Sequence, residues 1–152
     1  MKIELKELTK DIFVPWSAMR ERFWEDDVEE CARCFEIYKK RRTDQTALNL
    51  LAFDHVGSAA GFIESKLRTD YVEGVDASPV WYVEGIYVEP RARRKGVGHR
   101  LVRGLAERVG ATTLASSCEL DNEPSRRFHE AIGFREVQRT VDFVTTLYPD
   151  TT

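Results

Sequence analysis

Residues 80–88 form the strongest strand pattern in the chain and limit the folds that it can adopt. Their sequence, Val-Trp-Tyr-Val-Glu-Gly-Ile-Tyr-Val, has β-branched and aromatic residues on both faces, which predicts a central, buried strand. Glu84 and Gly85 do not suit such a strand. A buried carboxylate costs several kcal/mol unless it is hydrogen-bonded or faces a polar pocket, and an interior glycine indicates a bulge or the close approach of a ligand. Together they favour a functional site over a satisfied structural acid.

Around this strand, the hydrophobic periodicity predicts a mixed α/β protein. The chain has 152 residues and no repeat or linker, so we expect a single domain over residues 1–152. In chain order, the expected elements are a strand over 2–8, a short helix from Pro15 to Trp24, a helix over 28–41, strands over 48–54, 59–68 and 80–88, a helix over 96–109, a strand over 112–117, a helix over 124–132 and a closing pair of strands over 134–147.

The composition argues against several classes of protein. Charged residues make up 32% and hydrophobic residues 42% of the chain, as in soluble globular proteins, and a net charge of −3 argues against a nucleic-acid partner. No apolar run approaches the roughly 18 residues of a membrane span. The N-terminus lacks the apolar core of a signal peptide, so we expect a cytoplasmic protein with no membrane partner.

Cys31 and Cys34 form a C-x-x-C pair, which is typical of redox and zinc sites. Here the pair lies inside a helical pattern, and His55, His99 and His129 are scattered along the chain. A redox pair would sit at a strand-to-helix junction, and a zinc site would need a second pair of ligands. We therefore interpret both cysteines as half-buried structural residues and expect no metal.

Charge is distributed unevenly after residue 69. From Asp70 to Glu89 there are five acids and no Lys or Arg, whereas from Arg91 to Arg108 there are seven bases and one acid. This asymmetry suggests two sites of opposite sign. A solvated helix face is sufficient to explain three of the bases, Arg100, Arg103 and Arg108.

The basic segment begins with a loop that has the chemistry of a phosphate site. Residues 93–98, Arg-Arg-Lys-Gly-Val-Gly, follow the strongest strand and open the next helix. The two glycines let the backbone approach a ligand, the helix start presents unpaired N–H groups to phosphate oxygens, and the three bases add charge. The Rossmann glycine pattern and the Lys-Ser/Thr ending of a Walker loop are both absent from this loop.

This loop resembles the pyrophosphate-binding motif of the GNAT superfamily of acetyl-CoA-dependent N-acetyltransferases. A second segment, Asn122-x-x-Ser125-x-x-x-His129-x-x-x-Gly133-Phe134, is similar to the superfamily's pattern of Asn, a small residue, Tyr and Gly-Phe. The resemblance implies a GNAT-like fold, with a mostly antiparallel sheet splayed around the coenzyme and flanked by about four helices. It also implies acetyl-CoA as co-substrate, bound by Ile86, Tyr87, Val88, Arg93, Arg94, Lys95, Gly96, Val97, Gly98, His99, Asn122 and Ser125.

His129 stands where many members of the superfamily carry a tyrosine that is thought to protonate the departing thiolate. Histidine also donates protons, so the resemblance makes His129 the candidate general acid. The alternative interpretation is that His129 only packs under the short helix.

More narrowly, nearly the whole chain resembles the bacterial aminoglycoside 6'-N-acetyltransferases. The specific pieces are Val83-Glu84-Gly85-Ile86 and Leu120-Asp121-Asn122, since neither is a general feature of the superfamily. The residue chemistry agrees, because a ligand with several ammonium groups needs carboxylates and flat aromatic surfaces. Relatives often have histidine at the position of Asp27. The resemblance implies aminoglycoside contacts from Trp24, Asp27, Tyr71, Glu84, Asp121 and Asp142.

These residues predict direct transfer of the acetyl group from acetyl-CoA to a primary amine in a ternary complex. The amine must lose a proton before it attacks, so Glu84 and Asp121 are the candidate bases, and backbone donors near Gly85 would stabilise the oxyanion. No His–Asp arrangement is apparent beside Cys118, so an acyl-enzyme is not expected. The resemblance also implies a homodimer, in which the C-terminal strand could pair with a partner.

Two alternatives stay open. The same fold could acetylate another amine, such as a polyamine, an amino sugar or a protein N-terminus, or the chain could be a non-catalytic acyl-CoA sensor. Several carboxylates favour a small polycationic acceptor over a protein, which would need an open peptide groove. A sensor would bind the coenzyme without turnover.

Overall fold

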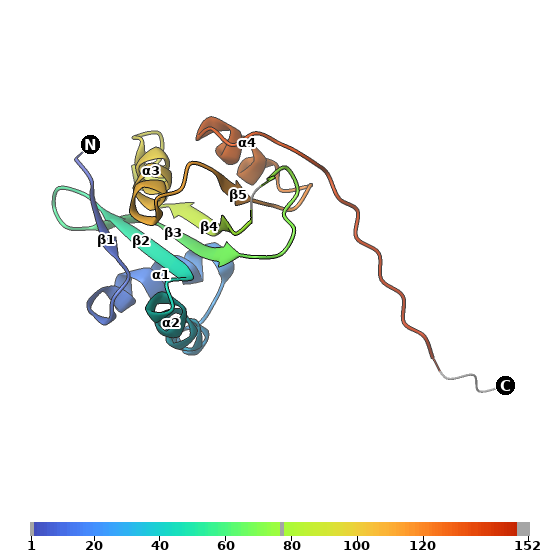
Figure 1. Cartoon of the computed structure of the whole chain (residues 1–152). Coiled ribbons are helices and arrows are strands. Elements are labelled where there is room, and N and C mark those ends of the chain that lie inside the picture. Colours follow the sequence, from blue (N-terminus) through green and yellow to red (C-terminus); the bar gives the residue numbers. More distant parts are fainter. Residues whose placement is uncertain (1, 77, 149–152) are drawn as a thin grey trace. The chain divides into compact units, whose positions relative to one another are not determined.

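The computed structural model describes residues 2–76 and 78–148 and divides the chain into two compact units, Met1–Ser117 (unit 1) and Cys118–Thr152 (unit 2) (Figure 1). In the described residues, unit 1 contains a mixed sheet and three α-helices, and unit 2 contains the fourth. The predicted mixed α/β class is therefore confirmed. A single catalytic domain over residues 1–152 stays a prediction.

Unit 1 is built on a sheet that has five strands among the described residues, in the order β1-β2-β3-β4-β5. The three pairs among β1, β2, β3 and β4 are antiparallel, and β5 is parallel to β4, which confirms a mostly antiparallel sheet. The strands are β1 (Glu4–Glu7), β2 (Ala47–Phe53), β3 (Ala59–Arg68), β4 (Val80–Val88) and β5 (Leu114–Ser116). β4 has the bounds that its sequence predicts.

β5 covers only part of β4. It pairs with residues 81–83, and no strand in the described part of unit 1 pairs with the rest of β4 on that edge. Residues 86–88, the predicted backbone contacts of the coenzyme arm, lie in this second half. The unpaired edge of a strand suits a ligand that adds as another strand.

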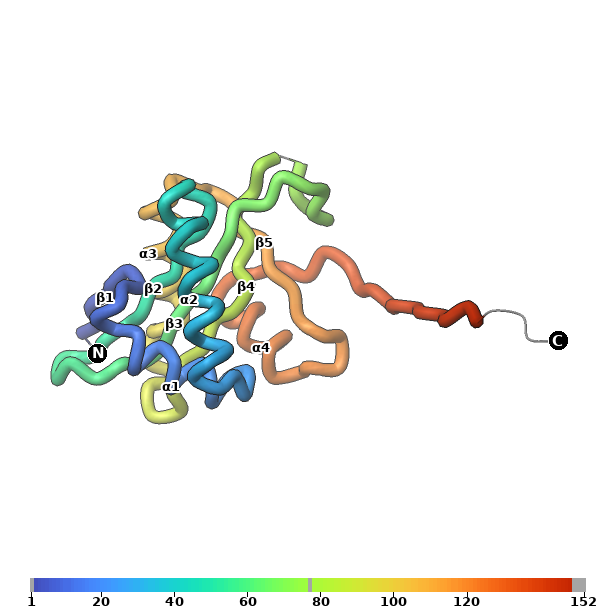
Figure 2. The backbone as a smooth tube through the Cα atoms, turned by 90° about the horizontal axis from the view of Figure 1, so that it is seen from below, coloured from blue at the N-terminus to red at the C-terminus, as the bar shows by residue number. Residues whose placement is uncertain are grey.

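Three helices of unit 1 cover the sheet, namely α1 (Phe13–Trp24), α2 (Val28–Thr43) and α3 (Val97–Val109). α1 and α2 pack on one face of the sheet, and α3 packs on the other (Figures 1 and 2). None of the helices in the described residues has both the length and the apolarity that crossing a membrane requires.

Signals at the helix ends account for these bounds. α1 follows a 3-10 turn, η1 (Lys10–Ile12), and places Pro15 in its first turn, where the missing N–H has no helical partner to lose. Asp27 caps α2, because its side chain accepts the backbone N–H three residues on. α3 follows the 3-10 turn η2 (Pro90–Ala92) and ends at Val109, just before Gly110, whose left-handed φ of 68° favours glycine.

The main core of unit 1 lies between the sheet and the helices α1 and α2. Trp16, Met19 and Phe62 are its largest fully buried side chains. Cys31 is fully buried in this core, and Cys34 packs against it, half-buried. The prediction of two half-buried cysteines is therefore wrong for Cys31, which is fully buried, and right for Cys34, and the packing of both supports a structural interpretation of the pair. The described residues contain no group of three or more His, Cys, Asp or Glu side chains that could hold a metal ion.

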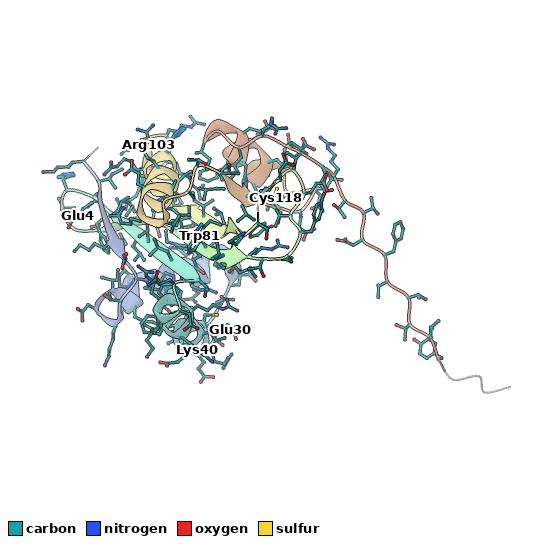
Figure 3. The ribbon with its side chains drawn as sticks, viewed as in Figure 1. Glu4, Glu30, Lys40, Trp81, Arg103 and Cys118 are labelled. Atoms are coloured by element: carbon teal, nitrogen blue, oxygen red, sulfur yellow. The ribbon has the colours of Figure 1, made fainter. Side chains whose placement is uncertain are left out.

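α3 buries the apolar stripe that its sequence predicts. Val97, Leu101 and Leu105 are fully buried, and the helix packs on β2 and β3. Arg103 lies exposed on the outer side of the helix, as expected of a solvated helix face (Figure 3). The basic residues that remain for a ligand are therefore those of the loop before α3.

Unit 2 contains α4 (Glu123–Ala131) and an extended segment after it (Figure 1). The prediction of a closing pair of strands over 134–147 is wrong, because residues 132–148 form no strand. The alternating sequence suits a strand, but a strand needs a neighbouring edge for its backbone hydrogen bonds, and this segment pairs with none of the described strands. Its apolar side chains are exposed, with Phe143 at 91% and Val144 at 96%.

Candidate active site

A bulge in β4 sets the geometry of the candidate site. Gly85 pairs with Glu64 on β3 and Val83 pairs with Ser65, so Glu84 is an extra residue between consecutive pairs. A bulge of this kind bends the strand and redirects a side chain. The irregularity that the sequence predicts at Gly85 is therefore present, and it removes Glu84 from the regular alternation of the sheet.

The bulge leaves Glu84 exposed, whereas most of β4 is buried. Its side chain is 39% exposed, so the desolvation cost of a carboxylate inside a sheet does not arise. The expectation of a strand buried on both faces is wrong at this position for the same reason. Lys66 Nζ lies 3.7 Å from Glu84 Oε2. No local pattern in the sequence singles out Lys66, because only the pairing of β3 with β4 brings it to the carboxylate.

Gly85 makes room for the indole of Trp24. A Cβ at position 85 would lie 2.3 Å from both Cη2 and Cζ2 of that ring, far inside van der Waals contact. The Trp24 ring also packs against Phe62, with 5.7 Å between the ring centroids. An aromatic ring from the end of α1 therefore lies against Gly85, the residue that follows Glu84 in β4.

Tyr71 and Asp27 make local contacts in unit 1. Tyr71 lies in the loop between β3 and β4, where its hydroxyl donates to Glu73 Oε2 at 2.5 Å, and this carboxylate raises the pKa of Tyr71. Asp27 Oδ1 accepts the backbone N–H of Glu30 at 2.8 Å. No hydrogen bond or ion pair within the described residues joins either side chain to Glu84. Their contacts with an aminoglycoside stay predictions.

Unit 2 carries the other predicted residues. Asp121 and Asp142 are exposed, the first in the turn before α4 and the second in the segment after it. The Asn122 side chain caps α4 by accepting the backbone N–H of Ser125 at 3.2 Å. The cap explains the asparagine at position 122, whereas it uses only the backbone of Ser125. The contacts of both residues with the coenzyme stay predictions.

His129 is half-buried on α4, with its ring edge-on to Phe134 at 5.4 Å between centroids. Its Nδ1 lies 2.7 Å from the backbone oxygen of Ser125. Because a carbonyl oxygen only accepts, Nδ1 carries the proton in this bond. Nε2 then bears a proton only when the ring is the charged imidazolium. A role for His129 as general acid therefore requires the charged ring.

The loop before α3 offers an open cradle. Arg94 and Gly96 both have left-handed backbones, with φ of 63° and 83°. A Cβ at Gly96 would meet no atom within 4 Å, so the space above the loop is free for a close approach. Arg94 and Lys95 are exposed, whereas Arg93 Nε donates to the backbone oxygen of Val88 at 3.0 Å and ties the loop to the end of β4.

The first turn of α3 completes this cradle. The first helical bond runs from Arg100 N to Gly96 O at 3.0 Å, so the amides of Val97, Gly98 and His99 precede the hydrogen-bonded part of the helix. Such amides, together with the positive end of the helix dipole, bind phosphate oxygens. With the exposed bases of the loop, this donor set fits the phosphates of coenzyme A.

The sequence was compared with models of known protein families. Residues 16–134 match the acetyltransferase (GNAT) family. The chain belongs to the GNAT family. The matched region contains β4 with its bulge, the loop before α3, and α4 through Phe134. Both motifs that carry the GNAT resemblance in the sequence therefore lie inside it.

Individual GNAT relatives confirm the narrower resemblance. The aminoglycoside N(6')-acetyltransferase type 1 of Acinetobacter genomosp. 13 is 34% identical over 139 residues, which cover 90% of this chain and 93% of that protein. The crystal structure of AAC(6')-Ih from Acinetobacter baumannii has a TM-score of 0.84 at 30% identity, covering 97% and 100% of the two chains. AAC(6')-Iy in complex with the bisubstrate analogue CoA-S-monomethyl-acetylneamine has a TM-score of 0.80 at 27% identity, with the same coverage.

Proposed function

We propose that this chain transfers the acetyl group of acetyl-CoA to the 6'-amino group of an aminoglycoside antibiotic and thereby gives resistance to it. One observation carries this proposal: the β4 bulge sets the exposed carboxylate of Glu84 next to Gly85, against which the indole of Trp24 lies. A carboxylate beside an aromatic face suits an ammonium group. The similar proteins that bear the name aminoglycoside N(6')-acetyltransferase support the same acceptor.

In this proposal, carboxylates and aromatic rings bind the several ammonium groups of the drug. The pair between Lys66 and Glu84 is partly exposed and worth about 0–1 kcal/mol, so an ammonium group of the substrate displaces Lys66 at little cost. Asp121 and Asp142 are exposed and add negative charge. The full set of proposed acceptor contacts is Trp24, Asp27, Tyr71, Glu84, Asp121 and Asp142.

The chemical step needs a proton acceptor and donors for the developing oxyanion. The acceptor amine arrives as ammonium, so Glu84 or Asp121, directly or through a water molecule, takes its proton before attack. Backbone N–H groups near Gly85 stabilise the oxyanion, and the charged His129 ring protonates the departing thiolate. The acetyl group moves directly to the amine in a ternary complex, with no covalent intermediate on the protein.

The coenzyme supplies the activated acetyl group. Residues 86–88 hold its extended arm through their backbones, on the part of β4 that β5 leaves uncovered. The loop over residues 93–98 and His99 hold the phosphates. Asn122 and Ser125 at the start of α4 complete the proposed contacts with the coenzyme.

Replacing Gly96 by valine should raise the KM for acetyl-CoA by at least about 10-fold. This is the change expected when one charge-assisted hydrogen bond to the coenzyme is lost. A β-branched side chain would occupy the open space above the loop and strain a residue whose φ is 83°. The KM for the amine should change little. Steady-state kinetics with each substrate varied in turn measures both constants.

Gly110 provides a matched control for this substitution. It lies at the other end of α3, also has a left-handed φ, of 68°, and also faces open space. Gly110→Val should therefore lower stability through similar backbone strain while leaving the KM for acetyl-CoA unchanged. Equal coenzyme constants in Gly96→Val and wild type would remove the loop from the coenzyme site.

We further propose that the protein is a cytoplasmic homodimer, in which the segment after α4 pairs with a second copy. Its exposed apolar side chains and alternating sequence support this pairing. The double change Phe143→Asp and Leu147→Asp should halve the mass seen by light scattering, whereas Val56→Asp, in an exposed turn, should not. A wild-type protein that is monomeric at all accessible concentrations would rule the pairing out.

A thiol-release assay tests the proposed function. Purified protein is incubated with acetyl-CoA and, in separate reactions, several aminoglycosides, spermidine, an amino sugar and a peptide with a free N-terminus. The highest kcat/KM should be for an aminoglycoside. Faster turnover of one of the other amines would assign a different acceptor, and coenzyme binding without any turnover would indicate a sensor.

A further inference from the structure

A buried ionic cluster in unit 1, formed by Arg20, Glu64 and Asp26, has no role in the steps above. Arg20 and Glu64 are only 7% and 9% exposed. Arg20 Nη1 donates to Glu64 Oε1 and Oε2 at 2.5 and 2.7 Å, and its Nη2 donates to Asp26 Oδ2 at 2.7 Å. Trp16 Nε1 donates to Glu64 Oε2 at 2.9 Å. The cluster therefore joins α1, β3 and the connection between α1 and α2.

Stability alone explains this cluster poorly. Burial raises the pKa of Glu64, and the ion pair with Arg20 only offsets part of that effect. Arg20 Nε is also buried, with no hydrogen-bond partner in the described part of the chain. Buried ion pairs are often replaced by apolar residues without loss of stability. The contacts of the cluster with its neighbours point to a role other than stability.

The cluster contacts the two elements that build the acceptor site. The Arg20 guanidinium carbon lies 4.6 Å from the centroid of the Trp24 ring, within the range of a cation–π contact. The same indole fills the space where Gly85 lacks a side chain. Glu64 is the register partner of Gly85 across β3 and β4. Arg20 is thus stacked on the aromatic ring of the site while it is anchored to the strand opposite the bulge.

We propose that Arg20 is a positioning residue for the acceptor. Held by Glu64 and Asp26, its guanidinium supports the Trp24 indole against Gly85 and keeps the aromatic surface beside Glu84. Trp24 ends α1 and is partly exposed, so without this support the ring has to be ordered each time a substrate binds. The effect on the acceptor rests on the proposed function, whereas the support of Trp24 does not.

Arg20→Lys tests the proposal without removing the buried positive charge that Glu64 needs. Lysine lacks the planar fork that both stacks on an indole and spans two carboxylates. The KM for the aminoglycoside should rise about 5- to 10-fold, in the range of a lost cation–π contact, while kcat and the KM for acetyl-CoA stay close to wild type. In a Trp24→Leu background, Arg20→Lys should add no further change. Arg42→Lys, which pairs with Glu7 on the surface of α2, is the control and should leave all three constants unchanged.

Tryptophan near-UV circular dichroism provides a readout that needs no substrate. Arg20→Lys should change the tryptophan signal of the wild type, and the change should be clearly smaller when Trp24 is already leucine. A residual change is expected there, because the Arg20 guanidinium carbon also lies 5.0 Å from the centroid of the Trp16 ring. If no aminoglycoside is turned over, the proposed function fails, and this spectrum still decides whether Arg20 supports Trp24. A folded Arg20→Lys variant with an unchanged spectrum, or effects on KM that multiply with those of Trp24→Leu, would overturn the proposal.

Asp26→Asn covers the case in which Arg20→Lys does not fold. It leaves the pair between Arg20 and Glu64 intact and weakens only the second anchor of the guanidinium. The same changes are expected at a smaller size, about 2- to 3-fold in the KM for the aminoglycoside. An unchanged KM together with an unchanged tryptophan spectrum in this variant would equally overturn the proposal.

Discussion

Replacing Glu84 by glutamine is expected to lower kcat/KM for aminoglycosides by about 1.5–3 kcal/mol, roughly a 10- to 150-fold loss. The bulge exposes the carboxylate for a charge-assisted hydrogen bond with an ammonium group, and glutamine keeps the shape but not the charge. The KM for acetyl-CoA should stay near wild type. Kinetics with both substrates varied measures each effect separately.

Asp121→Asn is expected to cause a similar loss, and pH–rate profiles distinguish the two carboxylates. Removal of the base should flatten the acidic limb of the profile, whereas removal of a binding group should only shift the KM. Glu36→Gln, on the exposed surface of α2, removes the same charge and is expected to have no effect. Wild-type kinetics toward every polycationic amine in both variants would place the acceptor site elsewhere.

Gly85→Ala is expected to lower the free energy of unfolding by about 1–3 kcal/mol, the range for an overpacked site. The new Cβ would lie 2.3 Å from two atoms of the Trp24 indole. The ring is not free to move away, because Phe62 and Arg20 pack against it. Urea denaturation of the purified variant measures the loss.

A double-mutant cycle isolates the contact between residues 24 and 85. In a Trp24→Ala background, Gly85→Ala should cost much less, because the atoms that it would meet are gone. Gly57→Ala is the control, since a Cβ there meets nothing within 4 Å, and its cost should not depend on Trp24. If the losses in the free energy of unfolding for Trp24→Ala and Gly85→Ala are additive, the indole is not the reason why position 85 requires glycine.

The features that the sequence predicts best have strong local patterns. The apolar run of residues 80–88 predicts a strand with the same bounds as β4. The apolar stripe from Val97 to Leu105 predicts a helix where α3 is found. The bulge is signalled by Gly85, a residue without a side chain inside an otherwise bulky strand. The open loop at Gly96 follows from its glycine and its place between a strand and a helix.

Features that depend on contacts between residues far apart in the sequence cannot be predicted from local patterns. Arg20 lies in the apolar stripe of α1, and only the fold brings Glu64 from β3 to its guanidinium. The segment after α4 has the alternation of a strand but no partner edge, so a local pattern overpredicts it. Asp27 shows the reverse case, in which a local signal is sufficient. An aspartate directly before a helix is a typical N-cap, and Asp27 caps α2, whereas the family resemblance assigns it only to the aminoglycoside.

The most direct test uses two aminoglycosides that differ only at position 6', where one carries an amine and the other a hydroxyl. Purified protein and acetyl-CoA are mixed with each, and released thiol and product mass are followed together. The proposed reaction predicts one thiol released per acetyl group added to the 6'-amine, and no turnover of the 6'-hydroxyl compound. Equal turnover of the two compounds would contradict it, because the acetyl group would then go to another position.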